Sequence, residues 1–168
     1  KKIEQFTAYD DNTPKSWNQL KVASVKSVLT FGDVKEVKIK VSISSVSCAN
    51  AAMNLQTELS HWGFDEIVKM SADRWNRELA RMSVETDDEP AKRIFYTAHY
   101  HTMIAPTLFC DVNGEYRGMN DMIYTDPKKA NYSTLSLWDT YRALHPLMTI
   151  IQPEMVDDVI NSMLSIYR

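Results

Sequence analysis

The sequence predicts an α+β, mainly helical protein, in which strands of an incomplete β-sandwich precede a partial helical toroid. Up to residue 45 the chain is rich in valine, isoleucine, threonine and aromatic residues, and it includes the alternating stretch VKEVKIKVSI, which is typical of a strand. From residue 47 onward, apolar residues recur every three to four positions, which is typical of helices. The order helix, hairpin, helix, helix after residue 88 resembles the first turns of a toroid.

The composition is that of a globular domain. The chain has 168 residues, of which 44% are hydrophobic and 24% are charged. A net charge of −3, without a dominant cluster of lysine or arginine, argues against nucleic acid as a partner. No apolar run approaches the roughly 18 residues of a transmembrane segment. Because the chain begins at Lys1 and not at a methionine, we expect it to be a piece of a longer protein.

Residues 1–45 are expected to form three strands, over 3–9, 20–31 and 34–44, with a hairpin turn at Gly32. Three strands cannot close a sandwich, because their apolar face needs a second sheet or a helix to cover it. We therefore interpret this region as part of an incomplete unit.

Two packing helices are expected in residues 46–82. Ser47 can cap the first helix, which ends near His61, and Asp65 can cap the second. Apolar spacing along the second helix predicts that its buried face consists of Ile67, Met70, Trp75, Leu79 and Met82.

A third helix is expected after a TDDEP loop, with Asp87 or Asp88 as its cap. The dipeptide Asn113-Gly114 then predicts a hairpin between 108–112 and 115–119, because both residues tolerate the positive φ of a type I′ turn. The predicted buried face of the helix consists of Ile94, Ala98, His101 and Ala105.

The next helix begins in the stretch YSTLSLWDTYRALHP, with Ser133 or Ser136 as its cap. Pro146 lacks an N–H group, so a kink or break is expected near His145. A final helix starts around Gln152. The predicted apolar stripe of the first of these helices consists of Leu137, Tyr141, Leu144, Met148 and Ile151.

Recognition residues are concentrated at the start of this helix. Trp138 and Arg142 are four positions apart on one side, and Asp139 is three positions from Arg142 and can pair with it. Asp139 also lies in the first turn, where the helix dipole favours a negative charge. An aromatic ring beside a fixed carboxylate and a guanidinium is a common way to hold a sugar. The alternative is a tryptophan packed under the next helix beside a surface ion pair.

No metal site is predicted from these residues. On a helix, His99 and His101 point roughly 200° apart, so that one shared ion is geometrically poor. The stretch DVNGEYRGMND has its glycine too early for a calcium loop and lacks the closing glutamate. A metal hydrolase that uses the two histidines is therefore the least favoured interpretation.

Two longer blocks resemble a known enzyme family. They are FYTAHYHTMIAPTLFCDVNGEYRGMN at 95–120 and YSTLSLWDTYRALHPLMTIIQPE, which begins at Tyr132. In this order and spacing they closely resemble the calcium-dependent, exo-acting α-mannosidases of glycoside hydrolase family ninety-two. With the upstream VKIKVSISSVS and the helix that bears Trp75, the resemblance covers most of residues 34–168.

The resemblance implies a domain organisation and a reaction. Residues 1–45 would be the last strands of an N-terminal β-sandwich, residues 46–82 linker helices, and residues 83–168 the first helices and hairpin of an (α/α)6 barrel catalytic domain. The implied reaction is the hydrolysis, with inversion, of terminal α-linked mannose, most often on α-1,2 linkages. The family's acid, base and calcium ligands lie further along the chain than residue 168. We therefore expect no catalytic residue and no metal ligand here, with calcium bound only by the full-length enzyme.

The resemblance also implies substrate-binding residues. Family barrels have the LWD segment at the sugar-binding mouth, so Trp138 and Asp139 correspond to contacts with the terminal mannose, and Arg117 and Arg142 are weaker candidates. Asn120 departs from the family's block, which has aspartate after YRGM, so no polar role is assigned to it.

The expected partners are a mannose-containing glycan and the remainder of the parent chain. The implied location is secreted, periplasmic or at the cell surface of a bacterium. Uncovered apolar faces would also favour self-association of this piece. The alternative to a mannosidase piece is a stand-alone carbohydrate-binding or protein-interaction module.

Overall fold

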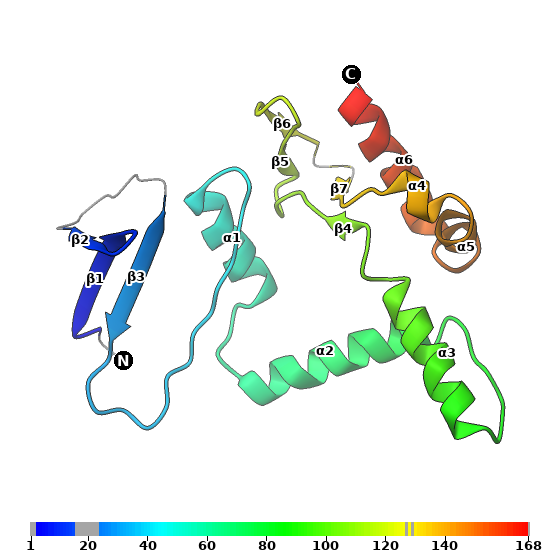
Figure 1. The fold of residues 1–168 in the computed structure, drawn as a ribbon, viewed down its shortest axis with the longest axis horizontal. Coiled ribbons are helices and arrows are strands. Elements are labelled where there is room, and N and C mark those ends of the chain that lie inside the picture. The colour runs from blue at the N-terminus through cyan, green and yellow to red at the C-terminus, as the bar shows by residue number, and fades with distance from the viewer. Residues whose placement is uncertain (1–2, 16–23, 127, 129, 168) are drawn as a thin grey trace. The chain divides into compact units, whose positions relative to one another are not determined.

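The computed structural model describes residues 3–15, 24–126, 128 and 130–167 (Figure 1). The chain divides into two compact units, residues 1–40 and 41–168. Small antiparallel sheets and a larger share of helix make up these units, which confirms the predicted α+β class. Within the described ranges, no helix is both long enough and apolar enough to cross a membrane.

The first unit is an antiparallel sheet with the strand order β2-β1-β3. Strand β1 (Gln5–Asp10) pairs along its whole length with β3 (Val25–Thr30) and at its end with β2 (Thr13–Lys15). Strand β2 lies between the first two predicted strands, where no strand was expected. Every residue of β3 is exposed, including Val25, Val28 and Leu29, so apolar side chains of this strand lie uncovered within the unit. The first part of the predicted strand 20–31 lies outside the described residues.

The predicted strand over 34–44 is wrong. The structure has no helix or strand in this described segment, and its alternating residues Val37, Ile39, Val41 and Ile43 are 40% to 85% exposed. Alternation gives a segment one apolar face, but a strand also needs a neighbour that accepts and donates backbone hydrogen bonds. In the described part of the chain, no strand ladder includes this segment.

Helix α1 (Cys48–Glu58) and helix α2 (Phe64–Leu79) are the two expected packing helices. Ser47 caps α1 as predicted, because its hydroxyl accepts the Asn50 N–H at 3.1 Å. The predicted cap of α2 is wrong, since the helix begins directly after Gly63 and Asp65 lies inside its first turn. There a carboxylate still interacts favourably with the helix dipole. Helix α2 has no fully buried residue, so its predicted apolar face is only partly covered.

Helix α3 (Glu89–His101) begins after Asp88, whose side chain accepts the Ala91 N–H at 3.0 Å as predicted. The predicted buried face of α3 is wrong: Ile94 is 70% exposed and His101 is also exposed, whereas His99 is buried. The sequence offers a second stripe at helical spacing, Phe95, His99 and Met103, and the protein covers that side instead.

The turn at Asn113-Gly114 forms, but the long hairpin predicted around it does not. Gly114 has a φ of 82°, and the Asp111 N–H donates to the Glu115 carbonyl at 2.8 Å across the turn. The adjoining residues pair with other segments. The two ladders are β4 (Thr107–Leu108) with β7 (Tyr132–Ser133), and β5 (Glu115–Arg117) with β6 (Ile123–Thr125).

The helix predicted in the Tyr132 stretch is divided into two parts. Helix α4 (Leu137–Thr140) has only four residues, and α5 (Leu144–Ile151) begins two positions before Pro146. Proline fits the first turn of a helix, because an N–H group there needs no intrahelical partner. The predicted break therefore occurs, but just before His145. Met148 and Ile151 of α5 are buried together with Val159 of α6 (Pro153–Tyr167), and these two helices contact each other.

Candidate functional site

Trp138 and Asp139 lie side by side in the short helix α4. The Ser136 carbonyl accepts the N–H groups of Asp139 and Thr140, each at 3.1 Å, and the Ser136 hydroxyl donates to Asp139 Oδ2 at 2.5 Å. These bonds fix the carboxylate within one turn. Trp138 is 87% exposed, so it is not packed under the next helix within the described chain. The pair presents an open aromatic ring next to a held carboxylate.

Arg142 does not form the predicted ion pair with Asp139. Its Nε donates to the Tyr141 hydroxyl at 2.9 Å, and its guanidinium carbon lies 5.7 Å from the centre of the Tyr141 ring. The physical reason is that α4 ends at Thr140, so helical spacing no longer brings positions 139 and 142 to one face.

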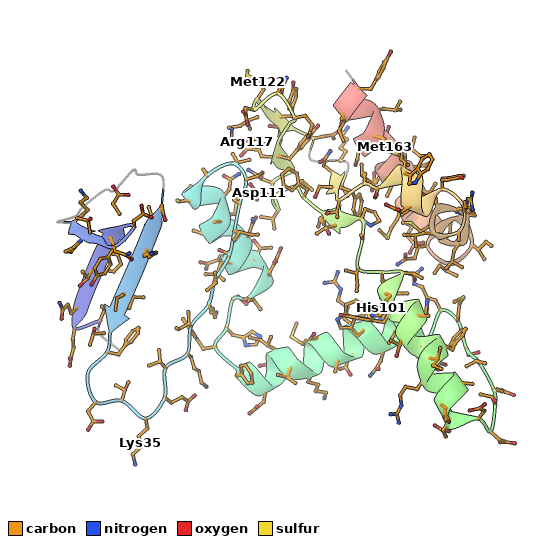
Figure 2. The ribbon with its side chains drawn as sticks, in the orientation of Figure 1. Lys35, His101, Asp111, Arg117, Met122 and Met163 are labelled. Carbon is orange, nitrogen blue, oxygen red and sulfur yellow. The ribbon has the colours of Figure 1, made fainter. Side chains whose placement is uncertain are left out.

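Arg117 belongs to a different part of the second unit. It lies on strand β5 (Figure 2). Its Nε donates to the Ser45 carbonyl at 2.7 Å and its Nη1 to the Asp121 carbonyl at 3.0 Å. The structure therefore holds Trp138 and Asp139 in one helical turn, has Arg142 just after that turn, and ties Arg117 to the β5–β6 hairpin. Sugar binding by these four residues stays a prediction.

Asp111 is the centre of a polar network that the sequence did not indicate. The carboxylate is 6% exposed and accepts three side-chain bonds, from Ser44 Oγ at 2.6 Å and from the amides of Asn50 and Asn54 at 2.7 Å each. The Asn50 amide also donates to Glu115 at 2.7 Å. The network joins the chain before α1, helix α1 itself and the Gly114 turn (Figure 2). The hint in the sequence is two asparagines four positions apart among the apolar residues of 48–55.

The network shifts the pKa of both carboxyl groups. Burial acts to raise the pKa of Asp111, but the hydrogen bonds from Ser44, Asn50 and Asn54 together lower it below its ordinary value. Hydrogen bonds from Asn50 and Asn113 lower the pKa of Glu115. In each case the donors stabilise the ionised form.

The lowered pKa of Asp111 predicts acid-sensitive folding. Because the folded pKa lies below the unfolded value of about 3.9, the contribution of Asp111 to stability is fully present above that value. It is lost as the pH falls through the folded pKa. We expect Asp111→Asn to be less stable than the wild type above about pH 5 and the gap between the two curves of unfolding free energy to narrow as the pH falls below the unfolded pKa of about 3.9. Urea unfolding across this pH range measures the difference in unfolding free energy between the two proteins. A difference that does not change with pH would contradict the prediction.

Possible metal ligands do not cluster in the part of the chain that the structure describes. No group of three or more His, Cys, Asp or Glu side chains converges within the ranges that the structure describes. The carboxylate oxygens of Asp111 face hydroxyl and amide donors, which occupy the positions that a cation would need. On α3, His99 is buried and His101 is exposed, so the two rings lie on different faces and do not share an ion.

Comparison with known proteins identifies the family. Residues 50–168 match the glycosyl hydrolase family 92 catalytic domain. The chain therefore belongs to glycoside hydrolase family 92, which confirms the resemblance seen in its sequence. No curated protein matches the chain significantly.

Solved structures of the same family share its fold. The family GH92 α-mannosidase BT3965 from Bacteroides thetaiotaomicron is 30% identical, with a TM-score of 0.78 over 99% of this chain and 24% of that chain. The same enzyme in complex with mannoimidazole gives a TM-score of 0.78 at 30% identity, over 99% of this chain and 23% of that chain. The GH92 family glycosyl hydrolase ccman5 shares the fold at 20% identity and a TM-score of 0.77, over 96% and 22% of the two chains. The present chain thus spans about a quarter of the length of these relatives.

Proposed function

We propose that this chain is the sugar-binding part of an inverting, exo-acting α-mannosidase that removes terminal, α-1,2-linked mannose from glycans. The observation that carries the proposal is the exposed ring of Trp138 beside the Asp139 carboxylate held by Ser136, in a chain that belongs to family 92. The ring stacks on the C–H face of the mannose, and the carboxylate accepts hydrogen bonds from its hydroxyl groups. The mannoimidazole complex of the Bacteroides enzyme supports a ligand of this shape.

Arg142 and Arg117 complete the proposed set of sugar contacts. The two side chains differ in the hydrogen bonds that they already make. Arg142 comes two positions after the end of α4, and its side chain is braced by the Tyr141 hydroxyl and ring. Arg117 already donates to two backbone carbonyls, and only its remaining N–H groups are free for a more distant part of the glycan.

The proposed enzyme needs groups that this chain does not supply. An inverting glycosidase uses two carboxyl groups about 6.5–9.5 Å apart, with a water molecule between them. We place the general acid, the general base and the calcium ligands in other parts of the parent protein, which acts outside the cytoplasm. Within this chain, Trp138 and Asp139 orient the mannose and transfer no proton. The uncovered face of the first sheet and the half-exposed face of α2 would contact the remainder of the parent chain, or a second copy in its absence.

The purified 168-residue chain is therefore expected to release no mannose from an α-1,2-linked mannobiose, with or without calcium. The full-length protein is expected to release it, because only the complete barrel has an acid and a base. Chromatographic detection of free mannose measures both. Release by the short chain that a chelator abolishes would contradict the proposal. Mannose binding without hydrolysis by the full-length protein would favour the stand-alone binding module.

A further inference from the structure

Ser162, in the middle of helix α6, is buried more deeply than the hydrophobic residues of the core. It is 1% exposed, compared with 2% for Val159 on the same helix and 3% for Met148 on α5. A buried hydroxyl group needs partners for both its hydrogen and its oxygen. The Ser162 hydroxyl donates to the Asp158 carbonyl at 2.7 Å and accepts the N–H of Tyr132 at 2.9 Å. The first bond lies within α6, whereas the second ties the helix to strand β7.

Strand β7 is also held on its β4 side, where the Asn131 N–H donates to Cys110 Sγ at 3.4 Å and the Thr134 hydroxyl donates to the Thr107 hydroxyl at 3.5 Å. Its ladder with β4 consists of two residue pairs, and a ladder of this length is not stable by itself. Just before the strand, the Asn131 carbonyl accepts the Phe109 N–H at 2.8 Å. The bond from Tyr132 to Ser162 is the side-chain hydrogen bond that holds the other side of β7, against α6.

The segment that follows β7 leads directly to the proposed sugar contacts. Thr134 has a φ of 63° and turns the chain, and Ser136 then begins the turn that fixes Asp139. The position of Trp138 and Asp139 therefore depends on where β7 is held.

We propose that Ser162 is a positioning residue for sugar binding: its oxygen anchors the Tyr132 N–H on α6 and thereby fixes the Trp138–Asp139 turn. This inference rests on the proposed function. Without the oxygen, the Tyr132 N–H loses its acceptor and regains one only if the strand end opens to water. The turn would then visit positions in which ring and carboxylate no longer meet the same sugar.

Two substitutions separate this role from simple packing. Ser162→Ala removes the oxygen at almost constant volume, whereas Ser162→Thr keeps a hydroxyl and adds a methyl group at a filled site. An anchoring role predicts that alanine does more harm than threonine, and a packing role predicts the reverse order. Ser165→Ala is the matched control, because the Ser165 hydroxyl donates only to the Ser162 carbonyl of the same helix.

The experiment uses the full-length enzyme with each of the three substitutions. We expect Ser162→Ala to raise KM for the α-1,2-linked mannobiose roughly tenfold with little change in kcat, and to accelerate amide hydrogen exchange in residues 130–140. The KM and exchange rates of Ser162→Thr should lie closer to those of the wild type, and those of Ser165→Ala should equal the wild-type values.

Wild-type KM and exchange in Ser162→Ala, or a larger defect in Ser162→Thr than in Ser162→Ala, would overturn the inference. Failure of the proposed function has a different signature, since the wild-type enzyme itself would then release no mannose. Amide hydrogen exchange can be measured on an inactive protein. Unchanged exchange in Ser162→Ala would therefore overturn the anchoring role of Ser162 even if the wild-type enzyme releases no mannose.

Discussion

Asp139→Asn in the full-length protein is expected to lower kcat/KM for the proposed mannoside substrate by roughly 10- to 150-fold. A hydrogen bond to a charged group contributes about 1.5–3 kcal/mol, and each ~1.4 kcal/mol corresponds to a factor of ten. Asparagine keeps an oxygen that can accept the Ser136 hydroxyl, so the turn that holds the side chain is preserved. The substitution therefore removes mainly the negative charge to which the mannose hydroxyls would donate.

The control for this variant is Asp157→Asn, which removes an exposed carboxylate from helix α6. Both variants should keep the wild-type melting temperature, because neither residue supports the core. Steady-state kinetics on the α-1,2-linked mannobiose measure the difference between them. An unchanged kcat/KM in Asp139→Asn would mean that Asp139 serves only to accept the Ser136 hydroxyl. In that case the aromatic ring of Trp138 would be the sole element of the proposed site in this turn.

The local parts of this fold follow from the sequence. Ser47 and Asp88 cap their helices as their positions predict, and Pro146 marks a break in the chain within a few residues of where it was expected. Each of these features depends on residues within one helical turn of one another, which is the range over which sequence spacing is informative.

The features that depend on distant partners could not be predicted in the same way. The alternation at 34–44 is as regular as that of a strand, but no strand ladder in the described chain includes it. Asn113-Gly114 forms its turn, yet β4 and β5 pair with strands that follow later in the chain. On α3, two apolar stripes overlap, and only the packing of the rest of the chain selects the one that contains His99.

The same distinction between local and distant partners applies to the candidate site. Trp138 and Asp139 are adjacent in sequence, so the pair was predictable from the motif LWD and from the helix start before it. Ser162 lies 30 residues from the strand that it anchors, and Asp111 collects donors from residues 57 to 67 positions away. Serine and asparagine on a helix are ordinarily solvated, and nothing in their local spacing shows that a distant backbone N–H or carboxylate will meet them.

Asp111→Asn is expected to destabilise the 168-residue chain by about 2–5 kcal/mol, because each buried donor left without an acceptor costs about 1–3 kcal/mol. In asparagine an NH2 group replaces one of the two carboxylate oxygens. Its hydrogens then face either the donors of Ser44 and Asn50 or the donor of Asn54. The loss extends further, since Asn54 also accepts the Val112 N–H at 3.0 Å and so holds the Gly114 turn from its other side.

Urea unfolding at neutral pH measures this loss, and Asp87→Asn, which changes an exposed loop carboxylate, should shift the free energy by less than about 0.5 kcal/mol. If Asp111→Asn also shifted the free energy by less than about 0.5 kcal/mol, water would be replacing the hydrogen bonds of the carboxylate without loss of stability. The network would then not hold the segment before α1. The expected loss is a large share of the about 5–15 kcal/mol that stabilises an ordinary domain. Because the bonds of Asp111 join the approach to α1 with the turn that leads into β5, the chain on both sides of the network should unfold together.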